Sequence, residues 1–130
     1  MNKEFIEICT NDNGSIFIKE EVIKVIAANT TIEIDGVMAL KGNTIDTVKK
    51  FIGTKSPGEG VYVERDSTGD VSLNIYISGT LEKNLKEVCQ NVQMGVSENI
   101  LKMTGLKVKA VNVYIESIIV GDREQSQKDE

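Results

Sequence analysis

Few combinations of residues in this chain are typical of a catalytic site. It contains no histidine, which excludes a histidine-based triad and an imidazole base. Two acidic pairs, Glu33 with Asp35 and Asp66 with Asp70, could act as acid–base groups or bind Ca²⁺. Segment 66–70 lacks the glutamate-terminated pattern of an EF-hand, so a solvated hairpin turn is the favoured interpretation.

The cysteines and the glycine-rich loop do not form a recognisable site either. Cys9 and Cys89 have no metal-ligand spacing. Cys89 falls on the apolar stripe of a predicted helix and suits a small core residue, whereas Cys9 is a candidate free thiol. Gly53, Gly58 and Gly60 do not form a phosphate loop, because no GK[ST] sequence follows them. We therefore expect no enzymatic activity, no metal and no cofactor.

Length and composition are typical of one globular domain. The chain has 130 residues, of which 40% are hydrophobic and 27% are charged. A net charge of −5 disfavours electrostatic binding to nucleic acid or to anionic lipid, which requires clustered Lys and Arg. Residues 1–13 do not resemble a secretory signal, and no apolar run approaches the ~20 residues of a membrane span. We expect a reduced, soluble, cytoplasmic protein.

Hydrophobic periodicity predicts a single α+β domain over residues 14–120. Residues 1–13 are assigned to an N-terminal extension and residues 121–130 to a polar C-terminal tail. Helices on one face of a mixed β-sheet are the economical packing for this order of elements. The expected elements are a strand at 14–18, a helix at 19–30, a strand at 37–40, one or two helical turns within 43–53, hairpin strands at 61–64 and 71–77, a helix at 81–103 and a strand within 108–119.

The helix at 81–103 has the clearest pattern in the chain. Thr80 is its expected N-cap, and Gly105 suits the left-handed position after its last turn, where Leu106 would fold back in a Schellman motif. Gly95 within the helix suggests close packing against a neighbouring element. The expected buried stripe consists of Leu81, Leu85, Val88, Cys89, Val92, Val96, Ile100 and Met103.

The opposite face of this helix contains a first candidate interaction surface. Met94 and Leu101 lie one heptad apart, beside Gln90 and Ser97, on an otherwise polar face. Two such residues are compatible with ordinary scattered exposure. They are also compatible with a docking patch for a second copy of the chain or for a partner helix.

Three tyrosines form a second candidate interaction surface. In each predicted strand, Tyr62, Tyr76 or Tyr114 alternates with the apolar residues and so points away from them. We therefore expect all three on the open face of the sheet, together with Asn74 and Asn112.

Three interpretations of these tyrosines remain open. Aromatic side chains on a bare sheet bind single-stranded nucleic acids, but Glu64 and Glu116 are expected on the same face, and the net charge is acidic. A protein contact is favoured over RNA, because tyrosine is enriched at interfaces. Ordinary surface tyrosines, favoured by strand propensity, are the third interpretation.

Short motifs spread over residues 14–119 carry a family resemblance through their order and spacing. They are Gly14-x-Ile16-x-Ile18, Glu21-Val22-Ile23 with Ile26-Ala27, Ile34-Asp35-Gly36-Val37, Gly60-Val61-x-Val63, Val71-x-Leu73-x-Ile75, Val92-Gln93, Met103-Thr104-Gly105-Leu106 and Val111-Asn112-Val113. With these motifs the chain resembles the alkaline shock protein family, also called the Gls-type general stress family, which is found mainly in Gram-positive bacteria.

The resemblance implies a small α+β fold without an established catalytic activity. Members are linked to envelope stress; some are held at the membrane by a membrane-embedded partner, and some are encoded beside enzymes of fatty-acid metabolism. We accordingly expect a non-enzymatic adaptor or scaffold for envelope or lipid homeostasis and stress response, whose partner is a membrane-embedded protein or a lipid-metabolism enzyme. The alternatives are a homo-oligomer, a small-molecule or acyl-chain sensor, and single-stranded RNA binding through the tyrosines. Direct membrane insertion is not expected.

Overall fold

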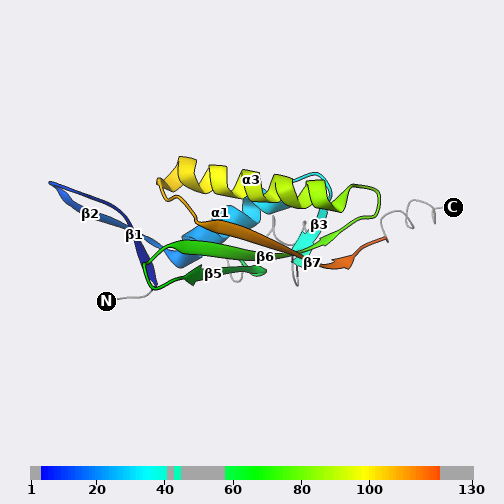
Figure 1. The fold of residues 1–130 in the computed structure, drawn as a ribbon, viewed down its shortest axis with the longest axis horizontal. Coiled ribbons are helices and arrows are strands. Elements are labelled where there is room, and N and C mark those ends of the chain that lie inside the picture. Colours follow the sequence, from blue (N-terminus) through cyan, green and yellow to red (C-terminus); the bar gives the residue numbers. More distant parts are fainter. Residues whose placement is uncertain (1–3, 41–42, 45–57, 121–130) are drawn as a thin grey trace.

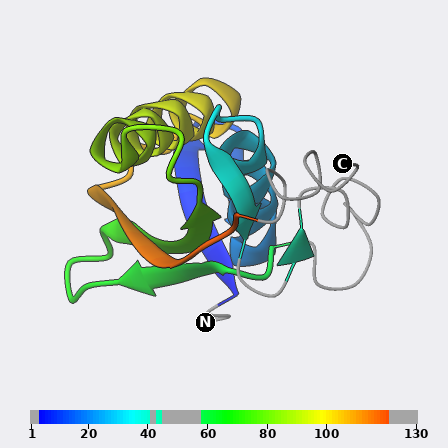
Figure 2. The same ribbon diagram turned by 90° about the vertical axis from the view of Figure 1, so that its right-hand side faces the viewer.

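A computed structural model describes residues 4–40, 43–44 and 58–120 of this chain, and it confirms the predicted α+β domain. Two helices, α1 (Glu20–Ile32) and α3 (Leu85–Thr104), pack side by side on one face of a mixed sheet (Figures 1 and 2). The strands are β1 (Phe5–Asn11), β2 (Gly14–Lys19), β3 (Val37–Leu40), β4 (Asn43–Thr44), β5 (Val61–Arg65), β6 (Val71–Gly79) and β7 (Ala110–Ile118).

Strand β6 is the centre of the main sheet. It pairs with β7 in parallel along nearly its whole length. Its other edge is shared by two antiparallel neighbours, with β5 along residues 71–75 and β3 along residues 77–79. The helix α3 connects β6 to β7 and crosses the same face of the sheet as α1, as a parallel connection requires.

The core lies between the helices and this sheet. Leu73, Ile75 and Ile77 of β6 are fully buried, and so are Val92 and Val96 of α3. The alternation in β6 and the helical spacing in α3 were both predicted, and they place these apolar side chains in one layer. The open face of β6 is more enclosed than expected, because its position between two sets of neighbours also buries Asn74 and Ser78.

The N-terminal residues form a strand that the sequence analysis did not identify. Residues 5–11 make up β1, which pairs with β2 in a separate two-stranded sheet that extends beyond the layered body (Figure 1). Asp12 and Asn13 form the connecting turn, and Gly14 follows with φ of +130°. The sequence Asp12-Asn13-Gly14 consists of residue types that favour turns, and it could have indicated the hairpin and hence β1.

The helix α3 begins four residues later than predicted. Its N-cap is Asn84, whose side chain accepts a hydrogen bond from the Glu87 N–H at 3.0 Å. Thr80 instead accepts from the Glu82 N–H within the preceding turn. Asn is a stronger N-cap than Thr, which accounts for the choice. Leu81 therefore lies outside the helix and is 66% exposed, contrary to its expected place in the buried stripe.

The C-terminal end of α3 is close to the prediction. Gly105 is left-handed, with φ of +80°, and its N–H donates to the Leu101 carbonyl at 2.8 Å. This is the single-bond αL motif rather than the expected Schellman motif, since the Leu106 N–H donates to Thr104 Oγ1. Met103, expected in the buried stripe, is 66% exposed at the edge of the helix.

The predicted helical turns within 43–53 mostly fall outside the described residues. Within the described part, Asn43 and Thr44 form the short strand β4 and pair with Leu40 and Ala39. They are therefore not the helix cap that the sequence suggested.

Candidate interaction surfaces

The open face of the main sheet brings all three tyrosines together, as predicted. Strand pairing places Tyr62, Asn74 and Asn112 side by side across β5, β6 and β7. In the next row Tyr76 pairs directly with Tyr114, and the Tyr76 N–H donates to the Gly60 carbonyl. We call these residues the tyrosine face; it consists of Tyr62, Tyr76, Tyr114, Asn74 and Asn112.

The ring of Tyr76 lies between the other two and contacts both. Tyr76 and Tyr114 are stacked, with centroids 4.6 Å apart and an interplanar angle of 10°. Tyr62 meets Tyr76 edge-on, at 5.5 Å and 90°. Both arrangements are favourable for aromatic pairs. Tyr62 and Tyr114 remain 41% and 45% exposed, so the cluster presents ring surface to solvent while its members hold one another in place.

Polar side chains fix β7 against β6 around these rings. The Asn112 Nδ2 donates to Asn74 Oδ1 at 2.9 Å, and the Ser78 and Ser117 hydroxyls are 2.7 Å apart. Asn74 is buried, so its side-chain oxygen is removed from water. The hydrogen bond from Asn112 replaces the lost hydration of that oxygen. Asn112 therefore positions the β7 half of the tyrosine face.

Acidic residues border the tyrosine face unevenly. Glu64 pairs with Ser72 one row from Tyr62, so it lies on the open face as predicted. Glu116, expected on the same face, lies at a register shift between β6 and β7. Ile115 pairs with Ile77, but Ser117, and not Glu116, is opposite Ser78. The alternation that would have assigned Glu116 to this face is therefore interrupted.

An ion pair joins the β5–β6 turn to the start of β7. The Lys109 Nζ lies 2.9 Å from Asp66 Oδ2. Hydrogen bonds from the Thr68 side chain and from Lys109 hold the pKa of Asp66 well below its usual range, and the same pair raises the pKa of Lys109. Asp66 also accepts from the Thr68 and Asp70 N–H groups. Asp66 thus organises the turn, which confirms the turn interpretation of segment 66–70.

The helix patch is the second candidate surface, and it consists of Met94, Leu101, Gln90 and Ser97. Met94 and Leu101 are 56% and 49% exposed. Gln90 is exposed, whereas Ser97 is half-buried and donates to the Met94 carbonyl. The patch lies on the side of α3 opposite its buried residues and so faces away from the sheet. The two candidate surfaces are on opposite sides of the molecule.

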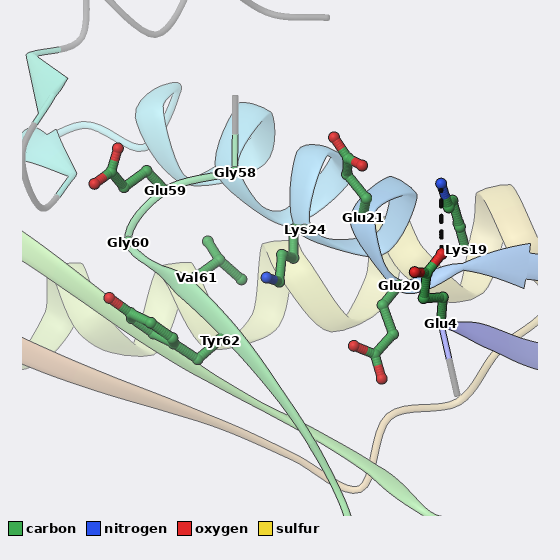
Figure 3. Close-up of a pocket in the computed structure, with 10 residues that line it drawn as sticks. All are labelled: Glu4, Lys19, Glu20, Glu21, Lys24, Gly58, Glu59, Gly60, Val61 and Tyr62. Atoms are coloured by element: carbon green, nitrogen blue, oxygen red, sulfur yellow. Dashed lines mark ion pairs between the residues drawn. The ribbon is translucent and has the colours of Figure 1, made fainter. Parts of the chain in front are cut away.

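A charged hollow adjoins the tyrosine face at β5. It lies between the first half of α1 and the segment that leads into β5, and Tyr62 is on its border (Figure 3). Val61 extends toward α1, whereas Tyr62 extends to the other side of the strand. The charged side chains that line this hollow are Glu4, Lys19, Glu20, Glu21, Lys24 and Glu59. Lys19 and Glu4 form an ion pair at 3.6 Å.

Other contacts explain residues that the sequence left without a role. Gln93 Nε2 donates to the Val111 carbonyl at 3.0 Å, which links two of the family motifs across α3 and β7. Gly95 lies against α1, since a Cβ there would be 3.4 Å from Thr30 Cγ2 and 3.5 Å from Ile34 Cδ1. Gly95 thus faces the neighbouring segment as expected, at a distance that a Cβ would fill with ordinary contacts.

The N-terminal hairpin exposes apolar side chains that the sequence analysis did not single out. Ile16 and Phe17 are adjacent in β2 and are both exposed, so the ribbon has an apolar residue on each face. Their alternation within β2 was visible in the sequence. Their exposure was not, because it follows from the position of the ribbon outside the main sheet.

Within the described ranges, the chemistry-bearing residues do not assemble into a metal site. No group of three or more His, Cys, Asp or Glu side chains there could hold an ion. Cys9 is exposed and Cys89 is half-buried, both as free thiols, and burial raises the pKa of Cys89. No helix in residues 4–40 or 58–120 combines the length and hydrophobicity that crossing a membrane requires.

Comparison with known proteins adds a family to this geometry. The model of the alkaline shock protein 23 family, described as having a cell envelope-related function, matches residues 9–120. YqhY of Bacillus subtilis is 31% identical over 105 residues, which cover 81% of this chain and 77% of that protein. YloU of the same organism is 28% identical, covering 82% of this chain and 90% of that protein.

A more distant relative carries a functional name. It is a stress response regulator gls24 homolog of Streptococcus pyogenes, 25% identical over 116 residues, and the match covers 88% of this chain but 64% of that protein. Among solved structures, a zinc form of a variant MamM CTD has a TM-score of 0.52 and 15% identity, covering 79% of this chain and 90% of that one. At that identity the likeness concerns the fold alone.

Proposed function

This chain belongs to the alkaline shock protein 23 family, and we propose that it is a non-enzymatic adaptor that serves the cell envelope through protein–protein contacts. The observation that carries this proposal is the tyrosine face. Its central ring, Tyr76, contacts both Tyr62 and Tyr114 on the face of the sheet that is opposite the buried residues of β6. Exposed tyrosines held rigidly by their neighbours lose little entropy on binding and are enriched at protein interfaces.

The partner we propose is a membrane-embedded protein or an enzyme of lipid metabolism. Either would bring the chain to the envelope through a protein contact. The family description supports the envelope, and the name of the streptococcal relative supports a role in stress response. The helix patch offers a second surface, so that one chain could hold two proteins or two copies of itself on opposite sides.

The acyl-chain sensor receives less support from the described residues. The space between helices and sheet is filled by side chains that are fully buried, among them Ile23, Ile75 and Ile100. The hollow beside β5 is charged, which does not suit an apolar ligand. We therefore do not propose a sensor.

Affinity capture of the tagged chain from its native cells, after gentle solubilisation of membranes, tests the adaptor. Wild type is compared with Tyr76→Ser/Tyr114→Ser and with Met94→Asp/Leu101→Asp, and the captured proteins are identified by mass spectrometry. We expect a membrane protein or lipid enzyme to be captured by wild type and lost with the tyrosine variant.

Each variant is a control for the other, because both change two side chains of a candidate surface and the two surfaces lie on opposite sides of the fold. Retention of every partner by both variants would contradict the proposal. Loss with the helix variant alone would move the adaptor surface from the sheet to α3. Circular dichroism of both variants must first show wild-type secondary structure.

A further inference from the structure

We propose that the tyrosine face docks a positively charged, arginine-bearing segment of a partner protein. This inference rests on the proposed adaptor function and specifies the chemistry of its partner. It is drawn from the arrangement of three tyrosine rings and a nearby carboxylate on one face of the sheet.

The rings provide the planar part of the site. A guanidinium group is planar and weakly hydrated, so it stacks on aromatic faces better than an ammonium does. Tyr62 and Tyr114 expose ring surface on either side of Tyr76. The stack of Tyr76 on Tyr114 and the adjacent bond between Asn74 and Asn112 hold this surface in place before any ligand arrives.

Glu64 provides the charge. It lies on the same strand and the same face as Tyr62, two residues away, which corresponds to about 7 Å along a strand. Glu64 is exposed and forms no ion pair or hydrogen bond with the described residues. A guanidinium stacked on Tyr62 would therefore have a carboxylate within reach of its N–H donors.

Among the residues that the structure describes, the cations near β5 do not form an ion pair with this carboxylate. Lys109 is paired with Asp66 at 2.9 Å, and Arg65 is paired with Glu20 at 2.9 Å. Lys24 lies in the hollow on the α1 side of β5 (Figure 3), where Glu59 also lies without a partner among the described residues.

The same charges argue against nucleic acid on these rings. The chain has a net charge of −5, and the Glu64 carboxylate on the same face would repel a phosphate backbone. Stacking of bases on the rings would therefore be opposed by electrostatic repulsion. A cationic peptide is attracted by the same negative charge, and its guanidinium groups can stack on the tyrosine rings.

Tyrosine fluorescence offers a direct test. The chain has three tyrosines and no tryptophan, so its whole tyrosine emission arises from this cluster. Purified full-length protein is titrated at low salt with an arginine–glycine repeat peptide of twelve residues. The matched probes are a lysine–glycine peptide and a glutamate–glycine peptide of the same length, and twelve-residue oligouridine. Anisotropy of labelled probes gives the affinities.

We expect the arginine peptide to change the emission and to bind at least several-fold more tightly than the lysine peptide. Tyr76→Ser should weaken its binding about 10-fold, because the central ring holds both neighbours. Glu64→Gln should weaken it about 3-fold, as the loss of one exposed ion pair does. Glu98→Gln removes the same charge from exposed α3 and should leave binding nearly unchanged.

Four results would overturn the inference: no binding of the arginine peptide at low salt, equal binding of arginine and lysine peptides, equal effects of Glu64→Gln and Glu98→Gln, or a preference for oligouridine. Its failure is separable from that of the adaptor. If capture of a partner still depends on Tyr76 and Tyr114 while the arginine peptide does not bind, the adaptor stands and the arginine chemistry is wrong.

Discussion

The two faces of β6 differ in what their side chains contact. On the helix-covered face, Leu73, Ile75 and Ile77 have no exposed surface, and they pack into one continuous core. On the opposite face, Tyr76 is half-buried and contacts the rings of Tyr62 and Tyr114. Adjacent residues of one strand thus belong to a layer that stabilises the fold and to a surface open to a partner. Substitutions at neighbouring positions should separate stability from binding.

The largest effect is expected for Ile75→Ala. Truncating a fully buried Ile removes transfer free energy and leaves a cavity, which lowers the free energy of unfolding by about 2–5 kcal/mol. Urea denaturation followed by circular dichroism measures the change. A loss below about 1 kcal/mol would show that the covered face is not the principal source of stability.

Tyr76→Ser, one residue along, should have a smaller effect on folding. The substitution removes two ring contacts from a half-buried site, each worth about 0.5–1.5 kcal/mol, so we expect a loss of about 1–3 kcal/mol in the free energy of unfolding. The near-ultraviolet dichroism of the tyrosines should change at the same time. If Tyr76→Ser destabilises the protein as much as Ile75→Ala, the tyrosines belong to the core and the contrast between the faces fails.

Gly95→Ala should sharpen the contrast from the helix side. An added Cβ would make ordinary contacts with Thr30 and Ile34 of the neighbouring segment, so the better helix propensity of Ala is gained without a clash. We expect a gain of about 0.5–1 kcal/mol in the free energy of unfolding.

The matched control for this gain is Gly36→Ala. At φ of +102°, its Cβ would lie 2.5 Å from Val88 Cγ2, so the same substitution should destabilise the protein. A loss of stability from Gly95→Ala would indicate that α3 and the segment of Thr30 and Ile34 cannot move apart enough to accommodate the methyl group.

The smallest effect concerns the ion pair at the end of the sheet. The folded-state pKa of Asp66 is lowered, so its contribution to stability is present above the ordinary pKa of about 4 and is lost as the pH falls below it. The pKa of Lys109 is raised, so its contribution is lost only in alkaline solution. Both groups are exposed to solvent screening.

Thermal unfolding of wild type and Asp66→Asn, measured from pH 2 to pH 7, tests this assignment. The difference in Tm should be greatest near neutral pH and should shrink in acid. An unchanged difference down to pH 2 would show that the charge of Asp66 does not account for its contribution to stability.

Local pattern was sufficient where a signal lies within one element. The alternation of Val71, Leu73, Ile75 and Ile77 predicted a strand with one buried face, and Gly105 marked the end of α3. The prediction failed at the start of α3, where two residues could cap the helix and Asn84, not Thr80, does so. It also failed at residues 5–11, which form the strand β1 and not an extension.

The direction in which each tyrosine points could be predicted from its own strand, because alternation within a strand is a property of the backbone. The contacts between the rings could not, because they depend on how the strands pair. Tyr76 contacts Tyr114 because β7 runs parallel to β6 in a register that places the two residues opposite each other. A hydrogen bond from Gln93 of α3 to the Val111 carbonyl joins the helix to β7. Strand neighbours and registers depend on such long-range packing, which no local period encodes.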